Sequence, residues 1–403
     1  RDRSVSRGLG DVYKRQVIVS EERFWTEFAA EYYSEANWEL LKAVLLIDAT
    51  TSWNAYLTDE LRVLSGKYSR ALSGTPQAMD KKKAAFYLAQ GPYNQALGLW
   101  YAGEKFSPEA KADVEAKVAT MIDVYKSRLQ TADWLAPETR EKAITKLNVI
   151  TPHIGYPEKL PETYDKKIID ENLSLVENAQ KLVEISIAHS WSKWNKPVDR
   201  SEWHMPAHMV NAYYDPQQNQ IVFPAAILQA PFYDIAQSSS ANYGGIGAVI
   251  AHEISHAFDT NGASFDENGS LKNWWTEDDY AAFKERTDKI VDQFEGLDSY
   301  GAKVNGKLTV SENVADLGGV ACALEAAKRD EDFSVREFFV NFATIWRTKA
   351  REEYMQMLAS VDVHAPAKWR TNVIVTNFDE FHKEFDVKEG DGMWRAPEAV
   401  SYT

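Results

Sequence analysis

Two histidines four residues apart, with a glutamate between them, are the residues of this chain best suited to chemistry. His252, Glu253 and His256 form the pattern H-E-x-x-H inside residues 243–259, which the sequence predicts to be helical. Residues i and i+4 project from one face of a helix, so both imidazoles can bind one metal ion. Glu253 lies about 100° around the helix and can reach a metal-bound water without being a ligand. The structural alternative is a pair of core histidines.

An acidic pair downstream bears on this choice. Glu312 and Asp316 are also four residues apart in a stretch predicted to be helical, so they share a face. One can complete the metal's ligands while the other hydrogen-bonds a ligating imidazole. Thr309 and Glu312 also fit the S/T-x-x-E capping box, which is a purely structural role. Two histidines and a distant glutamate form the ligand set of thermolysin-type zinc sites, which favours the metal ligand.

The elements that must position these residues are mostly helices. Apolar residues at three- and four-residue spacing predict helices within residues 20–97, from Ser107 onward, and over 137–147, 170–194 and 338–354. We expect the aromatic stripe on the first of these to be core; its members are Phe24, Trp25, Phe28, Tyr32 and Tyr33.

A β-hairpin is predicted just before the metal helix. Residues 209–214 and 220–223 are β-rich, and the turn-forming insert 215–219 separates them. An exposed strand edge can pair with an extended peptide by main-chain hydrogen bonds. His204 and His208 are four apart as well, but Pro206 interrupts the helix that a second metal site would need.

Composition excludes several classes of function. The 403 residues carry a net charge of −15, which disfavours nucleic acid or an anionic membrane as partner. The one cysteine, Cys322, allows no intrachain disulfide and is predicted to be a buried packing residue. No run approaches 18 apolar residues, so no membrane segment is predicted.

The two ends of the chain differ in character from the rest of the sequence. Residues 1–16 are basic without an apolar stretch, and with residues 401–403 they resemble translated sequencing-adaptor sequence, so we expect them to be non-native. We therefore expect an internal fragment. We expect a cytoplasmic location in a bacterium, and an extracytoplasmic one stays open; the oligomeric state is left open.

Several motifs in register resemble one family. These are V-I-A-H-E-I-S-H-A-F-D at 249–259, E-N-V-A-D-L-G-G at 312–319, and the stretch from Asp362 through His364 to Arg370. Together with residues 210–214 and 221–229, they resemble the neprilysin and endothelin-converting-enzyme family of zinc metallopeptidases. The sequence of these motifs is most similar to the bacterial oligoendopeptidase O branch, and the resemblance extends from about residue 24 to residue 397.

The resemblance implies a fold and a division into domains. The expected class is α+β, predominantly helical, with a thermolysin-like zinc catalytic domain and a helical second lobe. Residues 17–195 would form an incomplete helical lobe, and residues 196–403 the catalytic domain. In this family the site lies in a cavity between two lobes, which restricts substrates to short peptides.

The resemblance also implies a role for each site residue. One Zn²⁺ per chain would be held by His252, His256 and Glu312, with Glu253 as general base and His364 stabilising the oxyanion. Asp316, also counted among the catalytic residues, and Asp259 would orient His252 and His256. The expected substrate contacts are the Asn211 side chain, the Ala212 backbone, Arg370 steadied by Asp362, and an apolar pocket of Ile227, Phe232, Val249, Ile345 and Trp346.

The predicted function is therefore a zinc-dependent endopeptidase that cleaves short peptides on the amino side of bulky hydrophobic residues. Two alternatives stay open. One is a fragment that binds zinc but is inactive, and the other is a peptide-binding module that is not an enzyme.

Overall fold

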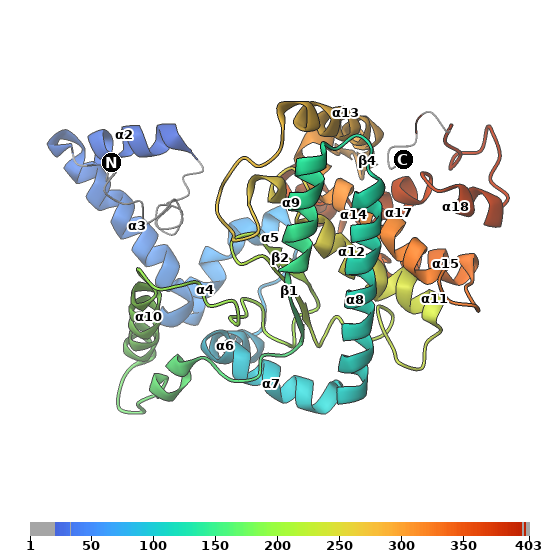
Figure 1. The fold of residues 1–403 in the computed structure, drawn as a ribbon. Helices are drawn as coiled ribbons and strands as arrows, with labels where there is room; N and C mark the ends of the chain where they lie inside the picture. Colours follow the sequence, from blue (N-terminus) through green and yellow to red (C-terminus); the bar gives the residue numbers. More distant parts are fainter. Residues whose placement is uncertain (1–20, 33, 397–398, 400–403) are drawn as a thin grey trace, which may run out of the picture. The chain divides into compact units, whose positions relative to one another are not determined.

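A computed structural model describes residues 21–32, 34–396 and 399, and within them the chain forms two compact units. The first unit comprises Arg1–Asn94 with Leu160–Val198, and the second comprises Gln95–Lys159 with Asp199–Thr403. The expected non-native residues 1–16 and 401–403, and Tyr33, lie outside the described residues. Both units are mainly helical (Figure 1), as the sequence predicts.

The first unit contains only helices among its described residues. Helix α3 contacts α4 and α10. Helix α10 starts with a capping box in which Ser174 and Glu177 satisfy each other's backbone N–H groups. The helices are α2 (Glu22–Tyr32), α3 (Trp38–Leu57), α4 (Asp59–Ser65), α5 (Lys67–Leu72), α6 (Lys81–Gln90) and α10 (Leu175–Ser192), with short 3₁₀ turns at Glu35–Asn37, Gly91–Tyr93 and Glu162–Lys166.

The prediction of a buried aromatic stripe on α2 is wrong for its first two members. Phe24 is 51% exposed and Trp25 is 57% exposed. Their rings contact each other and Phe28, and Phe28 in turn stacks on Tyr32, so the stripe packs along its own helix. Across the part of the chain that the structure describes, no helix combines the length and apolar character needed to cross a membrane.

The second unit carries the predicted metal helix and a small sheet. Its helices are α7 (Asn94–Lys105), α8 (Pro108–Thr131), α9 (Pro137–Asn148), α11 (Ser239–Asn242), α12 (Ala248–Ser255), α13 (Glu277–Phe294), α14 (Gly306–Ala327), α15 (Val335–Ile345), α16 (Glu352–Val361), α17 (Ala367–Val375) and α18 (Asp379–Glu384). A π-helical turn, η4 (Tyr243–Gly247), joins α11 to α12, and a 3₁₀ turn, η5 (Gly262–Ser264), follows α12.

The strands are β1 (Thr151–Gly155), β2 (Tyr213–Asp215), β3 (Gln220–Pro224), β4 (Asp298–Ser299) and β5 (Ala302–Lys303). The first three form one sheet in the order β1-β3-β2, with β3 buried along its whole length. β3 runs parallel to β1 and antiparallel to β2, and Tyr214 lies opposite Ile221. The predicted hairpin is therefore confirmed, although its first strand begins at Tyr213 and not at Met209, and β2 forms an edge of the sheet.

Helix α8 belongs with the metal-binding elements. It begins as predicted, since Ser107 Oγ accepts the Ala110 N–H and Pro108 occupies the first turn. Its buried face, which includes Val114, Val118 and Met121, packs in the same core as α12 and α14. Figure 1 shows the ribbon of α8 in the same part of the molecule as these two helices. This packing places residues 95–159 in the second unit, which differs from the division expected at residue 195.

The helix predicted over 338–354 is interrupted. α15 ends at Ile345 and α16 starts at Glu352, so the prediction of one continuous helix is wrong. No residue from 346 to 351 is buried, and a helix without an apolar face to pack gains little stability. The break leaves Trp346 at the end of α15.

Candidate metal centre and peptide cleft

Glycines allow the metal-binding helix to pass close to its neighbours. A Cβ on Gly244 would lie 2.1 Å from the Phe338 carbonyl oxygen, and one on Gly245 would lie 2.3 Å from that of Phe232. Both contacts are with backbone, which cannot rotate away. The glycines of η4 therefore set the depth at which α12 enters the core, and α12 carries His252 and Glu253, with His256 at its C-terminal cap.

The start of α14 rules out the purely structural role of Glu312. Asn305 is the N-cap, because its side chain accepts the Leu308 N–H at 3.0 Å. Thr309 lies inside the helix, where its hydroxyl donates to the Asn305 carbonyl. The capping-box alternative for Thr309 and Glu312 is therefore wrong, and Glu312 faces the two histidines instead.

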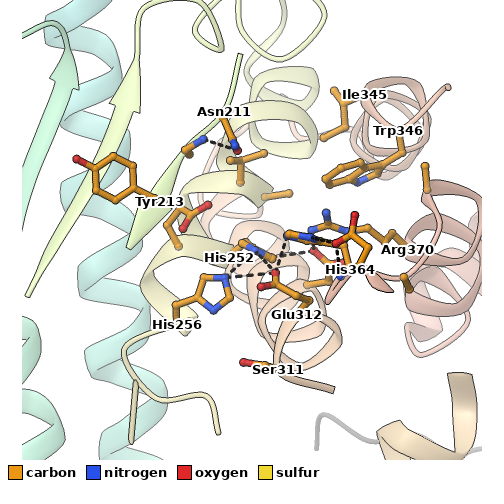
Figure 2. Close-up of a pocket in the computed structure, with 18 of the residues that line it drawn as sticks. Asn211, Tyr213, His252, His256, Ser311, Glu312, Ile345, Trp346, His364 and Arg370 are labelled. Atoms are coloured by element: carbon orange, nitrogen blue, oxygen red, sulfur yellow. Dashed lines mark hydrogen bonds and ion pairs between the residues drawn. The ribbon is translucent and has the colours of Figure 1, made fainter. Parts of the chain in front are cut away.

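The three predicted ligands converge. His252 Nε2 lies 3.0 Å from His256 Nε2, and Glu312 Oε2 lies 3.2 Å from the first and 3.5 Å from the second (Figure 2). These are the residues whose ligand atoms group as a possible metal site. A tetrahedron with bonds of about 2.0–2.1 Å has edges of about 3.3–3.4 Å, so the triangle has the size that zinc requires. Glu312 Oε2 is also buried, and three imidazole nitrogens, those of His252, His256 and His364, face it without well-aligned hydrogen bonds, an arrangement that a shared cation would explain.

A carboxylate contacts the Nδ1 atom of each of the two imidazoles. His256 Nδ1 lies 2.6 Å from Asp259 Oδ2, and His252 Nδ1 lies 2.8 Å from Asp316 Oδ1. Each contact favours a proton on Nδ1 and leaves Nε2 available as the metal ligand. Asp259 itself is held by Ser311 Oγ at 2.5 Å, a contact that no motif in the sequence indicates.

Arg370 pairs with a different carboxylate from the one expected. Its guanidinium donates two hydrogen bonds of 2.7 Å to Asp316, and it lies 3.9 Å from the centre of the Trp346 ring. Asp362 instead accepts the backbone N–H of His364 and lies 2.8 Å from His364 Nδ1. The expectation that Asp362 steadies Arg370 is therefore wrong, because Asp362 supports the histidine two residues away.

Two further groups face the ligand triangle. His364 Nε2 lies 3.2 Å from Glu312 Oε2, and Glu253 is 6% exposed beside the two ligating imidazoles. Burial raises the pKa of the Glu253 carboxyl, while the imidazoles of His252 and His256 act in the opposite direction. A carboxylate with a raised pKa is suited to accept a proton and return it near neutral pH.

Protons compete with a cation for the imidazoles of this site. Burial opposes charge on His256, but hydrogen bonds to Asp259 and Glu312 outweigh it and raise the pKa to about 11. Burial likewise opposes charge on Asp316, but Arg370 outweighs it and lowers the pKa of Asp316 to about 2. The pKa of Glu312 is also lowered well below its usual value by the three imidazoles despite burial.

A cavity of about 790 Å³ opens over this centre. All five residues predicted to form the apolar pocket line it: Ile227, Phe232, Val249, Ile345 and Trp346. Sequence reasoning missed the contribution of α16, whose Tyr354, Met355 and Leu358 also line the cavity. Their spacing of one and four residues marks a helix face, but residues 352–361 had no predicted relation to the site.

Asn211 and Ala212 lie at the rim of the cavity, just before edge strand β2. The Asn211 side-chain oxygen accepts the Ala212 N–H at 2.9 Å. The side chain predicted to bind a peptide thus satisfies a backbone donor of its own chain. His204 and His208 form no second cluster with the described acidic residues; His204 lies 3.2 Å from Asp215.

A helical fold with H-E-x-x-H on one helix and a glutamate from another defines a zinc-peptidase type of centre. Two sequence models, both described as peptidase family M13, match residues 2–157 and 211–400. The chain belongs to peptidase family M13.

Relatives and solved structures agree with this assignment. A neutral endopeptidase of Lactococcus lactis is 50% identical over 383 residues, which cover 95% of this chain and 61% of the relative. A Streptococcus gordonii protein with a zinc-metalloproteinase name is 75% identical over 323 residues, covering 80% of this chain and 57% of that protein. An endothelin-converting enzyme homologue of Locusta migratoria is 34% identical, with 88% and 51% covered.

The crystal structure of PepO from Lactobacillus rhamnosis matches with a TM-score of 0.88 and 40% identity, covering 93% of this chain and 59% of that one. The zinc metalloprotease Zmp1 of Mycobacterium tuberculosis, in complex with an inhibitor, matches with a TM-score of 0.81 and 36% identity, covering 88% and 56%. The chain thus spans about six tenths of the length of these relatives.

Proposed function

We propose that this chain carries the active site of a zinc-dependent endopeptidase, which cleaves short peptides on the amino side of bulky hydrophobic residues. The observation that carries the proposal is the triangle of His252, His256 and Glu312 beside the buried Glu253. We propose one zinc ion per chain, held by these three side chains. Bound there, zinc would lower the pKa of a water toward neutral and polarise the scissile carbonyl.

The protein's own residues would move the proton. Glu253 takes a proton from the attacking water and delivers it to the leaving amine. Its buried carboxyl, with a pKa raised by desolvation, can do both near neutral pH. Asp259 and Asp316 keep the ligating imidazoles in one tautomer during this cycle.

Two cationic groups would bind substrate oxygens: His364 the oxygen of the scissile carbonyl, and Arg370 another carbonyl of the peptide. His364 Nε2 lies 3.2 Å from the Glu312 oxygen that also faces His252 and His256, and hydrogen bonds to Glu312 and then to Asp362 raise the pKa of His364. Arg370 contacts both Asp316 and the Trp346 ring, which fixes its guanidinium and supports a role in binding a neighbouring substrate carbonyl. Losing one donor to a developing oxyanion typically costs about 100- to 1000-fold in turnover.

Substrate recognition would combine an edge strand with an apolar pocket. The rim at Asn211 and Ala212 and the edge strand β2 support main-chain pairing with an extended peptide. The five apolar pocket residues support a large hydrophobic side chain after the scissile bond.

The test is incubation of the zinc-loaded chain with a peptide mixture, read by mass spectrometry. We expect cuts before bulky apolar residues that disappear in Glu253→Gln and persist in Glu285→Gln, a matched change on the exposed face of α13. One zinc bound without cleavage would select the inactive fragment. Identical products from the wild type and Glu253→Gln, together with no bound zinc, would select the peptide-binding module.

A further inference from the structure

A lysine outside the metal centre is completely enclosed. Lys146, in the last turn of α9, is 1% exposed. Its Nζ donates three hydrogen bonds of 2.8 Å, to the carbonyl oxygens of Ala257, Gly262 and Phe265. An ammonium group has three N–H donors, so every one of them is used. All three acceptors lie in one segment, residues 257–265, which we call the zinc loop because it directly follows His256.

Aromatic rings complete the enclosure. The rings of Tyr214, Phe258 and Trp274 lie 5.7 to 5.9 Å from Nζ, at the outer limit of cation–π contact. Burial lowers the pKa of Lys146 to about 7, while the carboxylates of Asp259, Asp266 and Glu267 act in the opposite direction. The three carbonyl acceptors match the charged form, because a neutral amine would leave one of them without a donor.

The zinc loop carries the carboxylate that orients a ligand. Asp259 Oδ1 accepts the N–H groups of Asn261 at 2.8 Å and Gly262 at 2.7 Å, while Oδ2 faces His256. The loop folds back so tightly that a Cβ on Gly262 would lie 1.7 Å from the His256 carbonyl oxygen. Asp259 and Lys146 thus both hold the zinc loop, Asp259 through backbone N–H groups and Lys146 through backbone carbonyl groups.

The backbone of Lys146 reaches the peptide-binding edge. Its carbonyl accepts the side-chain N–H of Asn219 at 3.1 Å, and Asn219 has no exposed surface. The Tyr214 hydroxyl donates to the other side of the same amide at 3.1 Å, and Tyr214 belongs to edge strand β2. One residue therefore contacts both the zinc loop and the support of the edge strand.

We propose that Lys146 is a positioning residue of the metal centre. Its ammonium fixes the zinc loop so that Asp259 holds His256 with Nε2 directed at His252 and Glu312. The proposal rests on the proposed function in one respect, that the ion bound there is zinc. A buried ammonium is costly, and methionine would fill a similar volume, so packing alone does not explain a lysine here.

The experiment measures zinc affinity by chelator competition on the whole chain, for the wild type and Lys146→Met. We expect the variant to bind zinc about 10- to 100-fold more weakly, the usual loss when support behind a ligand is removed. The visible absorption spectrum of Co²⁺ bound in place of zinc should also change, because it reports ligand geometry.

The matched control is Thr139→Val, on the same helix. Thr139 is fully buried and donates at 2.6 Å to Asp279 of α13, so its loss should destabilise the fold without loosening the zinc loop. We expect a lowered melting temperature with unchanged zinc affinity and Co²⁺ spectrum. If Lys146→Met does not fold, Lys146→Gln, which keeps two N–H donors, is compared with the same control.

A double-mutant cycle tests the route through Asp259. If Lys146 acts by positioning that carboxylate, Asp259→Asn and Lys146→Met should together weaken zinc binding little more than Asp259→Asn alone. Fully additive losses, or a Lys146 variant with wild-type zinc affinity, would overturn the proposal. A wild-type chain that binds no zinc would instead remove the proposed function, so the two failures are distinguishable.

Discussion

Replacing Gly319 by alanine tests whether the spacing of two helices sets the metal centre. A Cβ at Gly319 would lie 2.8 Å from the His252 nitrogen, 2.9 Å from the Ala248 oxygen and 3.0 Å from the His252 Cα. All three atoms are backbone of α12, so no side chain can move aside. Glycine at this position therefore allows α14 to approach the α12 backbone closely.

The size of the effect follows from these distances. An ordinary contact begins at 3.4 Å, so the nearest pair must separate by about 0.6 Å (3.4 − 2.8). Glu312 lies seven residues before Gly319, two turns away on the same face of α14, and moves with it. Zinc sites tolerate about 0.2 Å in ligand distance, so we expect zinc affinity to fall about 10- to 100-fold. Overpacking should also cost about 1–3 kcal/mol of stability.

The assay is zinc competition with a chelator, together with thermal unfolding of the metal-free protein. The matched control is Gly103→Ala in α7, where a Cβ meets nothing within 4 Å. That change should raise stability by up to about 1 kcal/mol, the usual helix preference for alanine, and leave zinc affinity unchanged. Wild-type zinc affinity in Gly319→Ala would refute the idea that the contact between α12 and α14 sets the ligand geometry.

Three further predictions concern the charges around the centre. Zinc needs a neutral imidazole, whereas the pKa of His256 is raised from 6.5 to about 11. Zinc binding should therefore release protons, and the zinc affinity should increase by up to about tenfold per pH unit within that range. Calorimetry in buffers of different ionisation enthalpy measures this release, and a pH-independent affinity would contradict it. Asp316→Asn should lower the free energy of unfolding, measured in urea, by about 3–5 kcal/mol, because it leaves the buried Arg370 guanidinium without its anion. A loss below about 1 kcal/mol would count against that pairing. Asp362→Asn should lower peptide turnover by up to about 100-fold through His364 while zinc affinity stays the same; equal turnover would remove the role of Asp362.

The candidate metal ligands could be identified from the sequence because each pair follows from local periodicity. His252 with His256, and Glu312 with Asp316, are four residues apart on helices that the structure contains. The contact between the two helices is a tertiary one, but the thermolysin-type ligand set already predicts it. The hairpin was predictable for the same reason, since its β-rich composition and its turn are local.

Other features could not be read from the sequence because they depend on distant contacts. The parallel pairing of β1 with β3 joins Thr151 to Gln220 across the chain, so no local pattern predicts it. The sequence does not identify Asp316 as the partner of Arg370, because their pairing depends on the packing of α17 against α14. Lys146 gave no signal at all, since a lysine on an amphipathic helix ordinarily faces solvent.

The hydrogen bond between Asn211 and the Ala212 N–H has a consequence for selectivity. A peptide that pairs with this rim must displace an existing internal partner, so one hydrogen bond replaces another and little net free energy is gained. Main-chain pairing would then set the register of the bound peptide, while the apolar cavity supplies most of the affinity. Discrimination between peptides should accordingly follow the size of one side chain far more than the length of the segment.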